Sequence, residues 1–286
     1  MSLQSGARES PACLLGEVPP LPRRRPYDER MTRRTREPIY SFAIAVGRSL
    51  FGFWRLRPTA TGLQNIPASG GAVLAMTHFG YLDFALAEWS IYTHNKRYVR
   101  FMAQKAAFDK PLVGIALRGM KHISVDMKAG AAAYANAVDA LRRGELLGVF
   151  PEAGVSASFT VRELKSGAAR LAAEAGVPII PIAVWGGQRL LTKNHTVRFR
   201  ERFGVPVHFV FGEPIAVASM DDARTVTSAL RGTLQRMVDA VQASYPVPGT
   251  GQWWQPRHLG GIAPTPEEAS AADAERARRR EAARKN

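Results

Sequence analysis

"AVLAMTHFGYLDFALAEW", residues 72–89, joins a short apolar run to a second, more mixed one and places His78 and Asp83 between them. The stretch "GAVLAM" (71–76) has the length and composition of a buried strand, and residues 82–92 read as a helix. An ionisable side chain in such apolar surroundings costs free energy unless it is paired. The two residues therefore form a structural pair, share a metal ion with a third ligand, or handle a proton.

Strands and helices continue to alternate on both sides of this stretch. We expect further strands at residues 97–104, 121–126, 146–152 and 177–186, and helices at 129–143, 166–176 and 220–244, the last capped by Ser219. Residues 196–204 and 205–215 read as the two arms of a hairpin. The alternation predicts an α/β fold with a central, mostly parallel β-sheet flanked by helices. In such folds, functional sites gather at the carboxyl ends of the strands.

Composition divides the chain into four parts. Residues 1–36 are rich in Pro and Arg and predict a disordered basic leader without a signal peptide. Residues 37–58 predict an amphipathic helix, which either packs on the body or lies at a membrane interface. Its apolar stretch includes Arg48 and is short for a bilayer span of about 20 residues. Residues 59–250 form the α/β domain, and residues 251–286 a C-terminal strap and charged tail.

Charge points to an anionic partner. The formal net charge is +15, which favours nucleic acid, an acidic lipid surface or phosphorylated substrates. The sequence lacks helix-turn-helix, RNP-like and zinc-finger signatures, so we expect an anionic membrane surface and no nucleic acid. A non-catalytic basic module that binds nucleic acid or anionic lipid is the rival class, but it has no need of His78 and Asp83. A serine hydrolase typically carries the motif G-x-S-x-G, and a zinc enzyme the motif H-E-x-x-H. The sequence contains neither motif.

Helix geometry limits how His78 and Asp83 can meet. If both were helical, they would differ by about 140° around the axis and could not touch. They can meet if His78 lies in the strand-to-helix turn and Asp83 in the first helical turn. Asp83 would then hold one ring nitrogen and leave the other as a base. This is the Asp–His half of a catalytic triad without a serine, so the nucleophile can be a substrate hydroxyl.

Four motifs in order resemble those of the glycerolipid acyltransferases, the 1-acylglycerol-3-phosphate acyltransferase family. "THFGYLD" (77–83) is similar to the family's H-x-x-x-x-D motif, and "FMAQKAAF…GMKHISVD" to its second block, which usually ends I-P-V-D-R. "GVFPEAG" (148–154) is similar to the third block, usually F-P-E-G-T-R-S. "LKSGAARLAAEAGVPIIPIAV" resembles the lysine-glycine helix and closing strand of the family. The resemblance covers residues 60–215.

This resemblance implies an O-acyltransferase of phospholipid synthesis, peripheral or monotopic on the cytoplasmic face of the cell membrane. It implies transfer of a fatty acyl group from acyl-CoA or acyl carrier protein, as co-substrate, to a hydroxyl of a lysophospholipid. His78 would deprotonate the hydroxyl and Asp83 would orient His78, with no metal and no other cofactor. Five further residues are candidate substrate contacts: Lys105, Arg118, Glu152, Gly154 and Lys165. The amide of Gly154 is a candidate donor to the oxyanion.

Two departures from the family motifs concern the acceptor phosphate. Val155 and Met127 stand where the family usually has arginines that are associated with this phosphate. One expectation is a different acceptor: a larger lysophospholipid, another lysophospholipid or a glycolipid. The other is that the acceptor phosphate is held by Lys105, Arg118 or Lys165.

Overall fold

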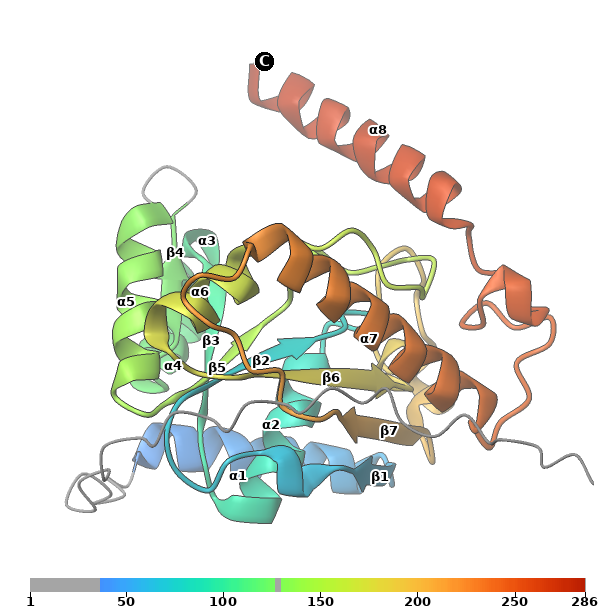
Figure 1. Ribbon diagram of the computed structural model, residues 1–286. Coiled ribbons are helices and arrows are strands. Elements are labelled where there is room, and N and C mark those ends of the chain that lie inside the picture. The colour runs from blue at the N-terminus through green and yellow to red at the C-terminus, as the bar shows by residue number, and fades with distance from the viewer. Residues whose placement is uncertain (1–36, 127–129, 286) are drawn as a thin grey trace, which may run out of the picture. The chain divides into compact units, whose positions relative to one another are not determined.

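The computed structural model describes residues 37–126 and 130–285, so the leader predicted over residues 1–36 and the position of Met127 lie outside it. A seven-stranded sheet with the order β1-β7-β6-β2-β5-β3-β4 forms the centre (Figure 1). All neighbouring strands run parallel except β6 and β7, which are antiparallel. The strands are β1 (Arg57–Thr61), β2 (Ala72–Met76), β3 (Val99–Gln104), β4 (Ile123–Val125), β5 (Leu146–Val149), β6 (Ile179–Trp185) and β7 (Pro206–Phe211). The predicted α/β fold with a mostly parallel sheet is confirmed.

Helices cover both faces of this sheet. They are α1 (Pro38–Phe53), α2 (Asp83–Asn95), α3 (Lys105–Phe108), α4 (Pro111–Gly119), α5 (Gly130–Arg142), α6 (Gly167–Ala175), α7 (Ala223–Ala243) and α8 (Pro266–Lys285). Alternate residues of β2 enter two separate hydrophobic clusters, as a strand buried on both faces requires. Val73 packs with α5, α6 and α7 on one face, and Leu74 packs with α1 and α2 on the other.

Helix α1 is two-sided. Tyr40, Ile44 and Phe51 are buried, and the hydroxyl of Tyr40 donates to the carbonyl of Val99 in β3 at 2.6 Å. Just before the helix, Glu37 forms a buried ion pair with Arg100 of β3 (2.6 Å). The opposite side exposes five large apolar residues: Ile39, Phe42, Val46, Leu50 and Phe53. Among the described residues, each helix is too short or too polar to cross a membrane.

The predicted hairpin is wrong. Phe199–Arg202 forms a 3₁₀ helix, and only the second arm becomes a strand, β7, which pairs with β1 and β6. The alternation in "TVRFRERFG" resembles a strand, but Phe199 is 56% exposed and its ring lies against Phe53 at the end of α1. The expected helix cap is also wrong, because α7 begins at Ala223 and is capped by the side chain of Asp222.

The segment after α7 folds back onto the body before α8 begins. Trp254 is buried and joins the hydrophobic cluster that contains α7, and its ring lies against Tyr245. The charged tail forms α8, whose described side chains are nearly all exposed, with Ala269 buried.

Candidate active site

The turn between β2 and α2 carries the two residues singled out from the sequence. His78 lies in the turn and Asp83 is the first residue of α2, as the helix geometry required. The carboxylate oxygen Oδ2 of Asp83 accepts the backbone N–H groups of Phe79 (2.8 Å) and Gly80 (2.7 Å). Asp83 therefore closes the turn that presents His78, in addition to contacting its ring.

His78 and Asp83 form a partly buried dyad. Nδ1 of His78 lies 3.4 Å from Oδ2 of Asp83. Burial raises the pKa of Asp83, while the contact with His78 and the two backbone amides favour the carboxylate. One face of the imidazole stacks on Phe150, with ring centroids 4.0 Å apart. The ring is thus held on one edge and one face, and Nε2 is the ring nitrogen that Asp83 does not contact.

Close backbone approach keeps the aspartate in place. A Cβ on Gly187 would lie 2.2 Å from Oδ1 of Asp83, and a Cβ on Gly80 would lie 2.7 Å from the carbonyl of Gly187. The turn after β6 therefore packs directly on the turn after β2, and only glycine fits at these two positions.

Glu152 fastens the third motif to the first. Its Oε1 accepts the backbone N–H of His78 (3.0 Å) and its Oε2 accepts that of Arg162 (3.1 Å). The backbone N–H of Ser156 donates in turn to the carbonyl of His78 (2.8 Å). Burial raises the pKa of Glu152 to about 7, against the stabilising effect of the two amides. Both of its oxygens face backbone donors, so the structure gives Glu152 a scaffold contact.

The other four predicted residues fall into two groups. Gly154 lies in the turn after Glu152, and a Cβ on it would be 3.7 Å from Nη1 of Arg162. Lys165 is exposed and lines the same cavity as Glu152. Lys105 and Arg118 lie on α3 and α4, where they bind their own surroundings: Lys105 the carboxylate of Asp109 (3.0 Å) and Arg118 the carbonyl of Phe108 (2.9 Å).

Sequence reasoning missed Phe150 and Arg162. Phe150 precedes the Pro-Glu turn and supplies the surface on which His78 stacks. Arg162 is in "TVRELKSG", between that turn and α6, and its backbone binds Glu152. An arginine ten residues after the motif glutamate was the available signal. Within the described ranges, His, Cys, Asp and Glu side chains do not gather in groups of three that could hold a metal ion.

Comparison with known proteins connects this arrangement to a family. A family model described as Acyltransferase matches residues 57–185, from β1 to the end of β6. The 1-acyl-sn-glycerol-3-phosphate acyltransferase of Bacillus subtilis is 30% identical over 149 residues, which cover 51% of this chain and 71% of that relative. The protein with the same description in Borreliella burgdorferi is 24% identical over 185 residues, covering 64% and 72%.

A solved structure has the same fold. The 1-acyl-sn-glycerophosphate acyltransferase from Thermotoga maritima aligns with a TM-score of 0.60 and 19% identity, over 72% of this chain and 81% of that one. The matched family segment contains the turn with His78 and Asp83 and the turn with Glu152. This chain therefore belongs to the acyltransferase family.

Proposed function

We propose that this acyltransferase moves a fatty acyl group from an acyl-CoA or acyl carrier protein thioester to a hydroxyl of a lysophospholipid. The observation that carries the proposal is the dyad of His78 and Asp83 at the carboxyl end of β2. Nε2 of His78 takes the proton of the acceptor hydroxyl, the oxygen attacks the thioester carbonyl, and the thiol leaves with a proton. Asp83 orients the ring, and the relatives named for 1-acylglycerol-3-phosphate support the class of acceptor.

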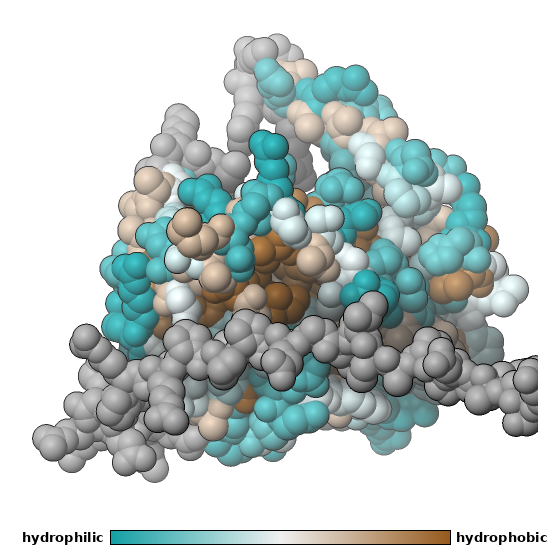
Figure 2. Space-filling view, viewed as in Figure 1, coloured by the Kyte–Doolittle hydropathy of each residue, from teal (hydrophilic) through white to brown (hydrophobic). Residues whose placement is uncertain are grey.

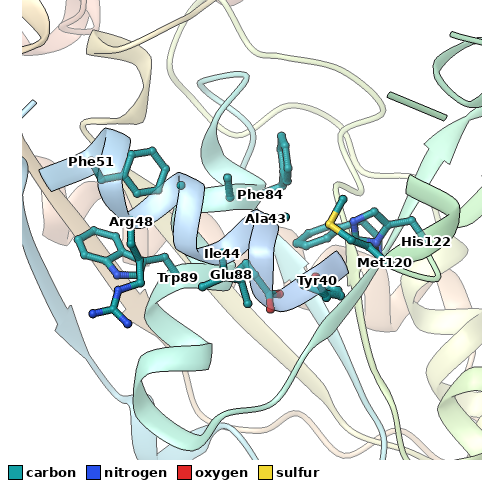
Figure 3. Close-up of a pocket in the computed structure, with 13 residues that line it drawn as sticks. Tyr40, Ala43, Ile44, Arg48, Phe51, Phe84, Glu88, Trp89, Met120 and His122 are labelled. Atoms are coloured by element: carbon teal, nitrogen blue, oxygen red, sulfur yellow. The ribbon is translucent and has the colours of Figure 1, made fainter. Parts of the chain in front are cut away.

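An apolar pocket near the dyad suits the acyl chain. The pocket has a volume of about 120 Å³ and lies between α1 and α2, with Ile44, Phe84 and Trp89 among its lining residues (Figure 3). Phe101 also lines it and stacks on Phe150, the residue that supports His78. The pocket is therefore separated from the dyad by these aromatic rings.

The test of this proposal is acyl transfer with a panel of donors and acceptors. We expect the purified full chain to acylate lysophosphatidic acid, lysophosphatidylglycerol or lysophosphatidylethanolamine from labelled acyl-CoA, with the product identified by mass spectrometry. Ala43→Leu places three extra carbon atoms in the pocket, so this variant should shift the preference to shorter acyl chains. Ala45→Leu is the matched control, since Ala45 is exposed on the same helix. Absence of acylated product from every acceptor contradicts the function, and equal chain preference in both variants contradicts the pocket assignment.

We also propose that the enzyme works as a peripheral protein on the cytoplasmic face of the membrane. The exposed apolar side of α1 continues onto α4, where Leu112 is 83% exposed and Ile115 58% exposed. The two helices are in close contact, because a Cβ on Gly119 would lie 2.4 Å from the side chain of Ile39. Lys105 and Arg118 sit beside this surface on α3 and α4, and they remain candidates for contacts with lipid phosphates.

Vesicle binding tests the membrane proposal. Phe42→Ser and Leu112→Ser should each weaken sedimentation with vesicles of phosphatidylglycerol and phosphatidylcholine by about 10-fold or more, since burying such a side chain contributes roughly 1.5–3 kcal/mol. Met220→Ser is the control, because Met220 is a large apolar residue that is even more exposed (93%) and lies just before α7 instead of on α1 or α4. Higher salt should weaken binding further if the basic residues contribute. Unchanged sedimentation of both variants contradicts this orientation.

A further inference from the structure

One carboxylate of α8 forms ion pairs with three cations, two of which come from other parts of the chain. Oδ1 of Asp273 lies 2.5 Å from Nζ of Lys193 and 2.8 Å from Nη2 of Arg276, and its Oδ2 lies 3.4 Å from Nη1 of Arg162. Burial opposes ionisation of Asp273, but Lys193, Arg276 and Arg162 outweigh it and lower its pKa. Asp273 is therefore an anion held in a cluster of positive charge.

Two of these cations are supplied by the loops that brace the His78 turn. Arg162 belongs to the loop that Glu152 ties to His78. The loop of Lys193 is tied to the same turn from the other side: the backbone N–H of Tyr81 donates to Leu191 (2.8 Å), and the hydroxyl of Thr192 to the carbonyl of Phe79 (2.6 Å). The arrangement places a guanidinium and an ammonium group on the two segments in direct contact with the catalytic turn.

A large polar cavity opens beside this cluster. It has a volume of about 670 Å³, and Glu152, Arg162, Lys165 and Asp273 are among its lining residues. The cavity joins the third motif, α7 and α8, and so it has room for a phosphate next to Arg162. In the present arrangement, the carboxylate of Asp273 takes the place that such an anion would occupy.

Helix α8 is held on the body mainly by polar contacts. Among the described side chains of α8, that of Ala269 is buried. Figure 2 shows that the surface of α8 is mostly hydrophilic. Asp273 and its partners are all partly exposed, with Arg162 at 33% and Asp273 at 22%. Ion pairs of this kind contribute little to stability and are screened by salt, so an anionic ligand can compete with them.

We infer that Arg162 and Lys193 form a site for a substrate phosphate, and that Asp273 occupies this site until a phosphate displaces it. This inference rests on the proposed function, because it assigns the phosphate to a substrate of acyl transfer. The phosphate belongs either to the lysophospholipid acceptor or to coenzyme A, since both molecules carry phosphate groups. Val155 stands where the family's third motif usually has an arginine. Arg162 can replace that arginine, because its guanidinium lies against Gly154, the residue before Val155.

Binding of two probes to the full chain tests the inference without turnover. Isothermal titration calorimetry with glycerol 3-phosphate and, separately, with coenzyme A should show about 10-fold tighter binding of one probe to Asp273→Asn than to the wild type. The probe that responds identifies the source of the phosphate. Arg162→Gln in the Asp273→Asn background should lose at least that 10-fold gain, since a charge-assisted contact is removed. Glu275→Gln, the control, removes a charge on α8 that pairs with Arg279 and should bind as the wild type does.

Two results overturn the inference. The first is that Asp273→Asn binds neither probe more tightly, which makes Asp273 a structural contact of α8. The second is that the double variant keeps the full gain. Acyl-transfer kinetics separate this outcome from failure of the proposed function. If the variants transfer acyl groups with wild-type KM values, the function stands and the phosphate site is wrong; if the binding changes occur but no variant transfers an acyl group, the anion site stands and the function is wrong. When both the phosphate site and the proposed function are correct, Asp273→Asn should lower KM for one substrate with kcat nearly unchanged.

Discussion

His78→Ala should lower kcat by about 10²- to 10⁴-fold while leaving the protein folded, because general-base catalysis is typically worth this much. The imidazole is partly exposed, and the bonds that hold the turn use backbone groups of residues 78–80, which alanine at position 78 retains. The measurement is single-turnover acyl transfer under saturating donor and acceptor, together with the unfolding temperature. Turnover at the wild-type rate in a folded His78→Ala protein would remove His78 from the mechanism.

Asp83→Asn separates two contributions of the aspartate. The amide keeps an oxygen for the backbone N–H groups of Phe79 and Gly80, but it no longer supplies a negative charge to His78. We expect a loss of activity comparable to that of His78→Ala, and little further loss when the two changes are combined, since the residues act as a unit. Losses that multiply in the double variant would show that the two residues act independently.

The stability of the fold should fall as pH rises from about 5 to 8, through the ionisation of Glu88. Burial raises the pKa of Glu88 to about 8, while its Oε2 accepts the backbone N–H of Val99. A carboxyl with a raised folded pKa contributes stability that is complete below the unfolded pKa, near 4.5, and is lost as pH rises through the folded one. The loss should reach about 1.4 kcal/mol per pH unit within this window.

Glu88→Gln should weaken this dependence, because glutamine has the shape of the protonated acid and does not ionise. The part that comes from Glu152, whose pKa burial raises to about 7, should remain. Urea unfolding at pH 5 and pH 8 measures the effect for the wild type, this variant and Glu267→Gln. The last is the matched control, since Glu267 is exposed at the start of α8. If the wild type and Glu88→Gln lose stability in parallel, ionisation of Glu88 is not the cause.

Local patterns predicted the central elements well because the strands they describe are buried. Residues 72–76 are apolar throughout and fully buried, and the strand-end rule then placed His78 correctly. The first edge strand, β1, was missed because "RPTAT" has no apolar pattern; it becomes a strand by pairing with β7. The strand predicted for the first hairpin arm was wrong for the opposite reason: the arm has an alternating pattern but does not join the sheet. Phe199 alternates with charged residues, yet its ring contacts Phe53 and Phe203, which lie outside the sheet.

The site was predictable only where one motif contains both partners. His78 and Asp83 are five residues apart, so helix geometry sufficed to relate them. Arg162, Lys193 and Asp273 meet through loops and a tail helix separated by up to 111 positions in the chain. A local sequence pattern cannot predict such a contact. The tail that carries Asp273 also lacks an apolar stripe that would indicate packing on the body.

The two-sided character of α1 has a practical consequence for anyone who wants a soluble form of this enzyme. Clipping the chain after Phe53 would discard the buried rings of Tyr40 and Phe51 and the partner of Arg100, so the product would be a damaged fold. The helix must be kept, and only residues on its outer side should be substituted. Hydrophilic substitutions at Phe42 and Val46 alter the outward surface and leave the inward contacts intact. Phe53 is kept, because its ring lies against Phe199 and Phe203. Solubility and integrity can thus be engineered separately on one and the same helix.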